Sequence, residues 1–320
     1  MTDNTEKVHI GVDVSSEKLD LAASHPVVDL PRQIENKAAA IKKWLRTLPE
    51  NAHLVCESSG PYHKLLLRLC WQAGVAVSRV NPERVRALAR AHALHAKTDT
   101  IDALLLAEFG RRQQPPPTPA PDPLRARLLE FNTRREQLIS MRTMELNRLK
   151  QPELDPSATS SIRRTISMLK AEIKRIEKDI DSLVSDSEEL SAQVKLLCKV
   201  KGVAKRTATS LLLTMPELGT ITRQNAASLA GLAPFSRESG RWKGQRRIRA
   251  GRSSVRNSIY MAALTAMRFN PRLKAFAERL ASRGKPFHLV ITAVMRKLLI
   301  CLNSILQKHL RPIPLNISLK

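Results

Sequence analysis

The sequence predicts a chain of three parts with different architectures. Residues 1–112 predict an α/β domain, because β-rich runs come first and strands then alternate with helices. Residues 124–190 predict a helical coiled-coil middle, because they contain an unbroken heptad pattern. Residues 191–320 predict a mostly α-helical domain that carries most of the net positive charge.

The first part contains the strands of the predicted sheet, which we expect to be mixed. An alternating pattern of apolar and polar residues, or a short apolar run, marks each strand. The expected strands are 7–14 (KVHIGVDV), 18–24 (KLDLAAS), 27–35 (VVDLPRQIE), 52–59 (AHLVCESS) and 74–80 (GVAVSRV). The expected helices are 36–48, 62–72, 82–92 and 99–112.

A Pro-rich segment separates the first part from the second. Residues 113–123 (QQPPPTPAPDP) predict a stiff, extended linker that ends the first domain. A helix with a looser apolar stripe follows over 124–150, and QPELDPSATS separates it from the next helix. The next helix has apolar residues spaced four and three apart over three heptads, at Ile162, Ile166, Leu169, Ile173, Ile176, Ile180 and Leu183. We expect this seam to support dimerisation, and the alternative is that the two helices pack only on each other within one chain.

The third part begins with a pattern typical of a helix-hairpin-helix. In residues 197–219 an apolar helix, a tight turn at Gly202 and a second helix follow one another. Backbone N–H groups at such a turn can bind a DNA phosphate. The usual second glycine is Ala204 here, so a simple corner between two helices is the alternative. The late apolar run 286–306 is interrupted by Arg296 and Lys297 and predicts a buried helix instead of a membrane span.

The charge of the chain indicates a polyanionic partner. The net charge is +25 and the sequence pI is about 10.6. Residues 191–320 contain 25 of the 54 Lys and Arg residues but only 3 of the 29 acids, so the third part holds most of the excess. Four scattered cysteines favour reduced thiols over disulfides or a zinc site. The polar start MTDNTEK has no signal-peptide pattern, so we expect a cytoplasmic, nucleoid-associated protein.

Four acids in the near-neutral first part are candidate metal ligands. Asp13 and Glu57 end two predicted strands, and Asp99 and Asp102 lie three apart at the start of a helix. Clustered carboxylates repel one another unless they hold a cation such as Mg²⁺, which prefers oxygen ligands. Taken singly, each acid is explained as well by a turn, a helix cap or a helix-dipole partner. The set of four at this spacing favours a metal site.

Several stretches together resemble a known family. They are HIGVDVSSEKLDLA, CESSGPYH, VNPERVRALARAHALHAKTDTIDALLLAEF and SLAGLAPFSRESGRWKGQRRIRAGRSSVRNSIYMAAL. In this order they resemble the transposase of the bacterial insertion-sequence one-ten family, the bridge-RNA-guided DNA recombinases. The resemblance covers nearly the whole chain, and the combination of K-T-D-x-x-D-A with the late E-S-G is specific.

The resemblance implies a fold, a metal site and a nucleophile. It implies a RuvC-like (ribonuclease-H-fold) first domain whose D-E-D-D site is Asp13, Glu57, Asp99 and Asp102, with two Mg²⁺ ions. It further implies a coiled coil and a C-terminal transposase domain with a catalytic serine, which falls on Ser239. The implied partners are donor and target DNA, a bridge RNA encoded by the element, and further copies of the chain in a homodimer or homotetramer, with no membrane.

The residues around Ser239 leave other nucleophiles open. Ser236, Ser253, Ser254, Ser258 and Tyr260 lie nearby, and Ser239 could equally donate a hydrogen bond to a phosphate. The motif match is what favours Ser239 as the residue that forms a covalent phosphoserine link to DNA. The residues expected to bind phosphates are Lys201, Lys205, Arg206, Arg241, Lys243, Arg246, Arg247, Arg249, Arg252 and Arg256.

Two other functions compete with this interpretation. A RuvC-like, Mg²⁺-dependent junction nuclease would use the four acids with water as the nucleophile. A non-catalytic nucleic-acid scaffold would use only the coiled coil and the basic domain, and it leaves the four acids unexplained.

Overall fold

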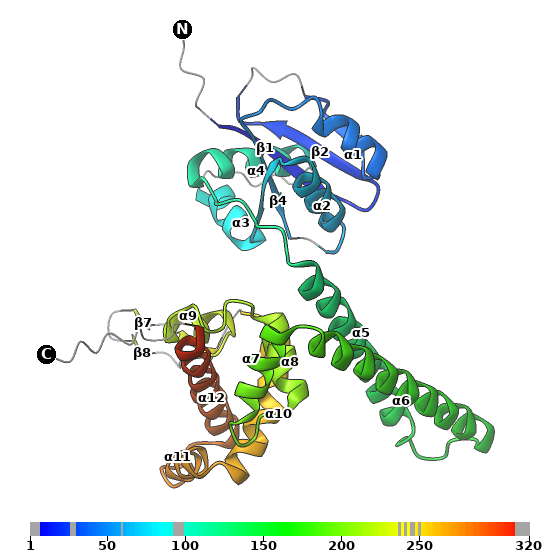
Figure 1. Ribbon diagram of the computed structural model, residues 1–320, viewed down its shortest axis with the longest axis vertical. Coiled ribbons are helices and arrows are strands. Elements are labelled where there is room, and N and C mark those ends of the chain that lie inside the picture. The colour runs from blue at the N-terminus through cyan, green and yellow to red at the C-terminus, as the bar shows by residue number, and fades with distance from the viewer. Residues whose placement is uncertain are drawn as a thin grey trace, which may run out of the picture. The chain divides into compact units, whose positions relative to one another are not determined.

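The computed structural model describes residues 7–25, 30–58, 60–91, 99–235, 238–239, 242–243, 247–248 and 251–310. These residues divide into two compact units, Met1–Pro121 and Asp122–Lys320. Unit 1 holds the larger sheet, and unit 2 is mainly helical (Figure 1).

Unit 1 is a five-stranded mixed sheet with helices on both faces (Figure 1). The strands lie in the order β3-β2-β1-β4-β5; β1, β3, β4 and β5 run in one direction, whereas β2 runs antiparallel to them. The mixed sheet predicted from the sequence is therefore observed. The strands are β1 (Val8–Val14), β2 (Lys18–Ala23), β3 (Gln33–Glu35), β4 (Ala52–Glu57) and β5 (Ala76–Val80). The helices are α1 (Ala38–Leu45), α2 (His63–Ala73), α3 (Pro82–Ala91) and α4 (Asp99–Gln113).

The alternation along β1 and β4 divides the apolar side chains between two cores. Ile10, Val12 and Leu54 pack with α1 and α2 on one face. Val55 packs with apolar residues of α3 and α4 on the other face. The sheet is therefore buried on both sides, as expected where parallel strands alternate with helices.

The Pro-rich segment does more than connect the two units. Thr118 donates its backbone N–H to the carbonyl of Val77 in β5, and its own carbonyl accepts the indole N–H of Trp71, at 2.8 and 2.9 Å. The hydroxyl of Ser78 donates to the proline carbonyls at 115 and 116. This part of the predicted linker thus covers the open edge of β5, which protects the sheet from pairing with another strand.

Unit 2 begins with a pair of long antiparallel helices, α5 (Pro123–Arg148) and α6 (Pro156–Ser185). Each starts with an Asp-Pro pair, in which Asp122 or Asp155 caps the helix and proline takes the first position. Five of the seven seam residues, from Ile166 to Ile180, are buried, and the four from Leu169 to Ile180 belong to the core that α6 shares with α5 and the helices after it. The alternative of packing within one chain is therefore observed, and dimerisation through this seam stays a prediction.

The rest of unit 2 is helical apart from four two-residue strands that the sequence analysis did not predict. The helices are α7 (Glu188–Cys198), α8 (Lys205–Thr214), α9 (Arg223–Leu229), α10 (Ser253–Phe269), α11 (Pro271–Ala281) and α12 (Phe287–Leu310). The strands are β6 (Pro234–Phe235), β7 (Glu238–Ser239), β8 (Trp242–Lys243) and β9 (Arg247–Ile248).

Two features of these helices follow from packing. At the predicted hairpin turn, Gly202 has a φ of +103°, and a Cβ there would lie 2.7 Å from the backbone of Ala266, so this turn is pressed against α10. In length and composition α12 could cross a membrane, but half of its most apolar window is buried against neighbouring helices. The late apolar run therefore serves the core of unit 2.

The buried His53 predicts a stability that depends on pH. Its Nε2 lies 2.8 Å from the Ser78 hydroxyl, whose single proton is used by the proline carbonyls, so Nε2–H is the donor of a neutral ring. Burial, with His9 and Lys7 as further causes, lowers the pKa of His53 to about 4. The unfolded chain therefore binds a proton that the folded chain does not, and we expect unit 1 to lose roughly 2–3 kcal/mol of stability as the pH falls from about 6.5 to 4.

Urea unfolding followed by tryptophan fluorescence at several pH values measures this loss. His53→Gln removes the titrating group and should flatten the dependence, whereas His309→Gln at the end of α12 should leave it unchanged. Equal pH dependence in the wild type and His53→Gln would contradict the assignment.

Candidate active site

The register of the sheet places Asp13 and Glu57 at one edge. Val12 pairs with Cys56 in the parallel strands β1 and β4, and Asp13 and Glu57 are the next residues along each strand. The face follows from alternation: Gly11 contacts α4, and Val55 packs with α4, so both acids lie two residues further on the α4 face. Both are half-buried.

The packing of α4 on β1 brings Asp102 toward the same edge. A Cβ on Gly110 would lie 2.8 Å from His9, whereas a Cβ on Gly11 would lie only 1.9 Å from the carbonyl oxygen of Ala103. The helix therefore runs opposite to β1, and its first turn, which contains Asp102, reaches the end of the strand where Asp13 lies. Asp99 is the first residue of this helix, and its side chain lies outside the described residues.

The described acids share an edge but do not form a ligand cluster. Among the described residues, no group of three or more His, Cys, Asp or Glu side chains is close enough to hold a metal ion. The donors are nonetheless carboxylate oxygens, half-buried and directed to one face, and such oxygens suit a hard divalent cation. The arrangement fits a site that is completed by a fourth acid and the ions themselves.

A further acid, which the sequence analysis missed, lies next to this edge. Asp20 pairs directly with Asp13 across β1 and β2, on the same face of the sheet. The Gln33 amide donates to it at 2.8 Å, and the Lys18 ammonium lies 3.4 Å away. Its position in an alternating strand opposite Asp13 is the signal that could have found it. Because Lys18 and Gln33 satisfy Asp20, its negative charge adds little to the repulsion at the edge.

The predicted nucleophile lies between α9 and α10, in residues 234–248, which we call the arm. Residues Pro234 and Phe235 (β6) pair with Arg247 and Ile248 (β9), and Ser239 in β7 pairs with Trp242 in β8. The side chains of Ser239, Lys243 and Arg247 lie outside the described residues, as do Arg241, Arg246 and Arg249 altogether.

The base of this arm is tightly packed. Gly251 has a φ of +72°, and a Cβ there would lie 2.2 Å from the backbone nitrogen of Gly231. The next residue, Arg252, donates two hydrogen bonds to Glu217, at 2.6 and 2.7 Å. Burial opposes ionisation of Glu217, but the hydrogen bonds from Arg252 and the backbone hold its pKa below the usual value. Arg252 therefore anchors the returning strand of the arm.

Among the competing nucleophiles, Ser258 is one whose hydroxyl has hydrogen-bond partners within the protein. The Ser258 hydroxyl donates to the carbonyl of Ser254 in its own helix and lies 2.8 Å from the Ser210 hydroxyl. Ser253 and Ser254 form the first turn of α10, and Tyr260 lies exposed further along that helix. Ser236 lies outside the described residues.

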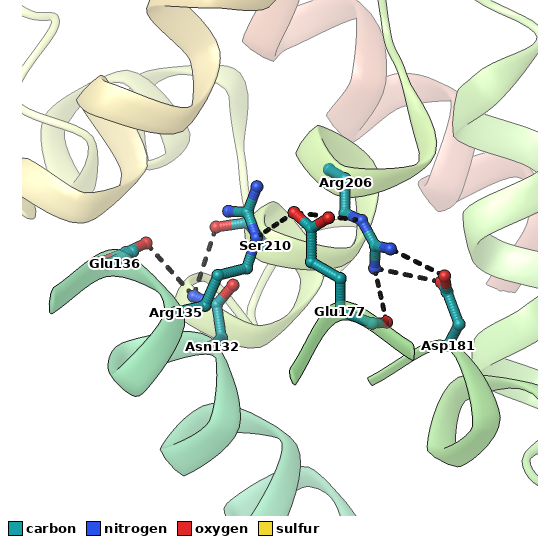
Figure 2. A network of polar contacts seen from close by, with 7 residues as sticks. All are labelled: Asn132, Arg135, Glu136, Glu177, Asp181, Arg206 and Ser210. Atoms are coloured by element: carbon teal, nitrogen blue, oxygen red, sulfur yellow. Dashed lines mark hydrogen bonds and ion pairs between the residues drawn. The ribbon is translucent and has the colours of Figure 1, made fainter. Parts of the chain in front are cut away.

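Figure 2 shows that Arg206 belongs to a polar network joining α6 to α8. Its guanidinium binds Asp181 through two nitrogens, at 2.7 and 3.1 Å, and also donates to the carbonyl of Glu177. The Glu177 carboxylate accepts from Arg135 of α5 at 2.7 Å, and Lys205 pairs with Asp181 at 2.9 Å. Lys205 and Arg206, which the sequence analysis expected to bind phosphates, therefore hold the helical pair to the rest of unit 2.

The remaining expected phosphate-binding residues divide in the same way. Arg256 donates to the carbonyl of Ala230, whereas Lys201 is exposed beside the turn at Gly202. Three cations that the sequence analysis did not select, Arg223, Arg296 and Lys297, have no carboxylate partner among the described residues and line one large groove.

Comparisons with known proteins match most of the chain. A transposase family model of the DEDD IS110 type matches residues 10–152, and a model described as "Transposase IS116/IS110/IS902 family" matches residues 194–278. Two curated relatives, both called "Pilin gene-inverting protein", come from Moraxella lacunata and Moraxella bovis. Each is 28% identical over 307 residues, which cover 92% of this chain and 94% of the relative.

The contact between Gly11 and α4 predicts that Gly11→Ala displaces the helix. The added methyl group would overlap the Ala103 carbonyl, so we expect the free energy of unfolding to fall by about 3 kcal/mol. Ala22→Gly, the opposite change at the residue that pairs with Gly11, should cost only about 1 kcal/mol. Urea unfolding of both variants measures the difference, and equal losses would show that α4 does not need Gly11.

The base of the arm allows a comparison of two left-handed glycines. Gly251 and Gly284 have φ values of +72° and +71°, but a Cβ at Gly284 would meet nothing within 4 Å. Gly284→Ala should therefore cost about 1 kcal/mol for the backbone alone, whereas Gly251→Ala adds the overlap with Gly231 and should cost about 3 kcal/mol or more. Thermal unfolding of the two variants tests the contact, and similar midpoints would contradict it.

Proposed function

The chain belongs to the IS110 family of transposases, and we propose that it cleaves and rejoins DNA with a metal site in unit 1 and a serine nucleophile in unit 2. As a member of this family it is a DNA-recombining enzyme whose partner is DNA, and the family implies a divalent metal ion and a RuvC-like first domain. The packing of α4 on β1 is the observation that most supports the metal site, because it directs Asp13, Glu57 and Asp102 to one edge.

The proposed metal ligands are Asp13, Glu57, Asp99 and Asp102, with Mg²⁺ as the ion and two ions in each site. When bound, two such ions stabilise the charge on the attacking and leaving oxygens of a phosphoryl transfer. The four carboxylates would bind the ions and neutralise their positive charge. The half-buried edge restricts the contact of the bound ions with water. Asp20 accepts a hydrogen bond from Gln33 and pairs with Lys18, so its carboxylate lies beside the site without competing for the ions.

The proposed covalent step uses the hydroxyl of Ser239. Its oxygen attacks the phosphorus of a DNA phosphodiester, so one Oγ–P bond forms and one P–O ester bond breaks. The departing DNA oxygen takes up a proton and becomes a free hydroxyl, while the serine hydroxyl loses its proton. The hydroxyl of a second strand then attacks the phosphoserine, restores a phosphodiester and returns the proton to Ser239. The number of phosphoester bonds is conserved, so the exchange needs no other energy source.

The proposed reaction includes recombination at two DNA sites. The names of the Moraxella relatives describe inversion of a pilin gene, and inversion requires cleavage and rejoining at two sites. The arm that carries Ser239 is the most basic stretch of the chain, and Arg241, Lys243, Arg246, Arg247 and Arg249 would contact phosphates without reading sequence. We assign the selection of the DNA sequence to a bridge RNA encoded by the element. We place the reaction in the bacterial cytoplasm, at the nucleoid.

A homodimer or tetramer would bring two sets of acids and two serines to paired DNA sites. The heptad seam packs within the chain, and we propose that other surfaces of the helical pair also contribute to association. Met141, Met144 and Met168 are 42%, 51% and 66% exposed on α5 and α6 and supply apolar area there. The metal site of one subunit could then act with the serine of another.

Trapping of a covalent adduct tests this function. A DNA oligonucleotide nicked close to the cleavage point prevents rejoining, so the wild type should accumulate a protein–DNA adduct whose attached peptide contains Ser239. Ser239→Ala and Asp102→Asn should abolish the adduct, whereas Ser253→Ala, a nearby exposed serine in α10, should retain it. Cleavage by Ser239→Ala at the wild-type rate would indicate water as the nucleophile and refute the serine mechanism.

A further inference from the structure

A large groove lies at the base of the arm in unit 2. Its volume is about 1360 Å³, and α9, α11 and α12 provide most of its walls. Pro234 and Ile248, which pair with each other where the arm begins and ends, line the same groove. The groove is therefore continuous with the segment that carries Ser239.

The lining combines an apolar floor with a cationic rim. Leu232, Ala293 and Ile300 contribute to the floor, and the exposed Leu289 and Ile248 extend it to the surface. Arg223, Arg296 and Lys297 form the rim, and no Asp or Glu is among the described residues that line the groove. Such a surface fits a ligand that has flat apolar groups and regularly spaced negative charges.

The rim cations differ from three cations of unit 2 that the sequence analysis expected to bind phosphates. Lys205, Arg206 and Arg252 are neutralised by Asp181, Glu177 or Glu217 within the chain. Arg223 and Arg296 have no ion pair among the described residues, and Lys297 lies 4.2 Å from the centre of the Phe276 ring. The charge in the groove is therefore available to a ligand.

We propose that this groove binds a single DNA strand, with unpaired bases on the apolar floor and phosphates on Arg223, Arg296 and Lys297. The groove exceeds the usual 300–1,000 Å³ of a small-molecule site, so a polymer segment suits it better. Proteins that bind single strands combine a positive groove with aromatic side chains on which bases stack, and Phe276 and His288 are the described aromatic rings that line this groove. The strand is DNA because the groove meets the base of the arm whose serine attacks DNA, and in this respect the inference rests on the proposed function.

Binding of a 20-nucleotide single-stranded DNA to the full chain tests the groove, with fluorescence anisotropy over a range of salt concentrations. The triple variant Arg223→Gln, Arg296→Gln and Lys297→Gln should bind at least tenfold more weakly. Its slope of log affinity against log salt should fall by about 2, since each lost phosphate contact removes roughly 0.7. A matched triple, Arg163→Gln, Arg164→Gln and Lys174→Gln, removes the same charge from exposed positions of α6 and should retain most of the affinity.

A second pair of variants separates the shape of the groove from its charge. Ala293→Trp fills the floor without changing charge and should also weaken single-stranded DNA binding, whereas Ala192→Trp at an exposed position of α7 should not. Equal binding by the groove triple and the matched triple would overturn the proposal. So would a loss limited to single-stranded RNA or to duplex DNA, because each would assign the groove to another ligand.

The outcome is independent of the serine mechanism. Ser239→Ala should bind the single strand like the wild type, since the groove and not the hydroxyl supplies the affinity. If the groove triple binds single-stranded DNA as tightly as the wild type and also forms the covalent adduct at the wild-type rate, the groove assignment fails and the proposed function stands. If neither the wild type nor any variant forms the adduct, but the groove triple loses affinity for single-stranded DNA, the proposed function fails and the groove assignment stands.

Discussion

The contact between Gly11 and the backbone of α4 determines the geometry of unit 1. No side chain larger than hydrogen fits at this position, because the Ala103 carbonyl and the Ala107 nitrogen occupy the space of a Cβ. The helix therefore lies directly on β1, and its direction is fixed by a second close contact at Gly110. Asp102 comes near Asp13 as a consequence of these two glycines, although neither glycine carries any chemistry.

The sequence predicted the acids better than it predicted what positions them. Asp13 and Glu57 were recognised because each ends an apolar strand, and strand ends of parallel neighbours meet at one edge. Asp20 was missed because an acid inside an alternating strand is usually solvent-exposed, and only the register shows that it pairs with Asp13. The role of Gly11 was also missed, since a glycine in a strand does not reveal which element will approach it.

The helical pair shows how one pattern can support two structures. A heptad seam buries the same apolar residues whether the partner helix comes from another chain or from the same one. Here α5 supplies the partner, which the sequence analysis had left as the alternative because the apolar stripe of α5 is looser than the heptad seam. QPELDPSATS was interpreted as a break between the two helices, and the break is observed, although the last five residues of this segment, from Pro156, already belong to α6.

Charge in unit 2 is divided between holding the fold and remaining free for a ligand. Sequence counts treat all Lys and Arg residues alike, and so they selected Arg206 and Arg252 together with the arm. The structure gives both residues two hydrogen bonds to a carboxylate, whereas Arg223 and Arg296 face a groove in which the structure describes no acidic lining residue. Moving such an arginine to a phosphate would leave its half-buried carboxylate unpaired, so the paired cations are costly to recruit for phosphate binding. Cations without such a partner can bind a polyanion without breaking the fold, and the three in the groove lie at the base of the arm that carries Ser239.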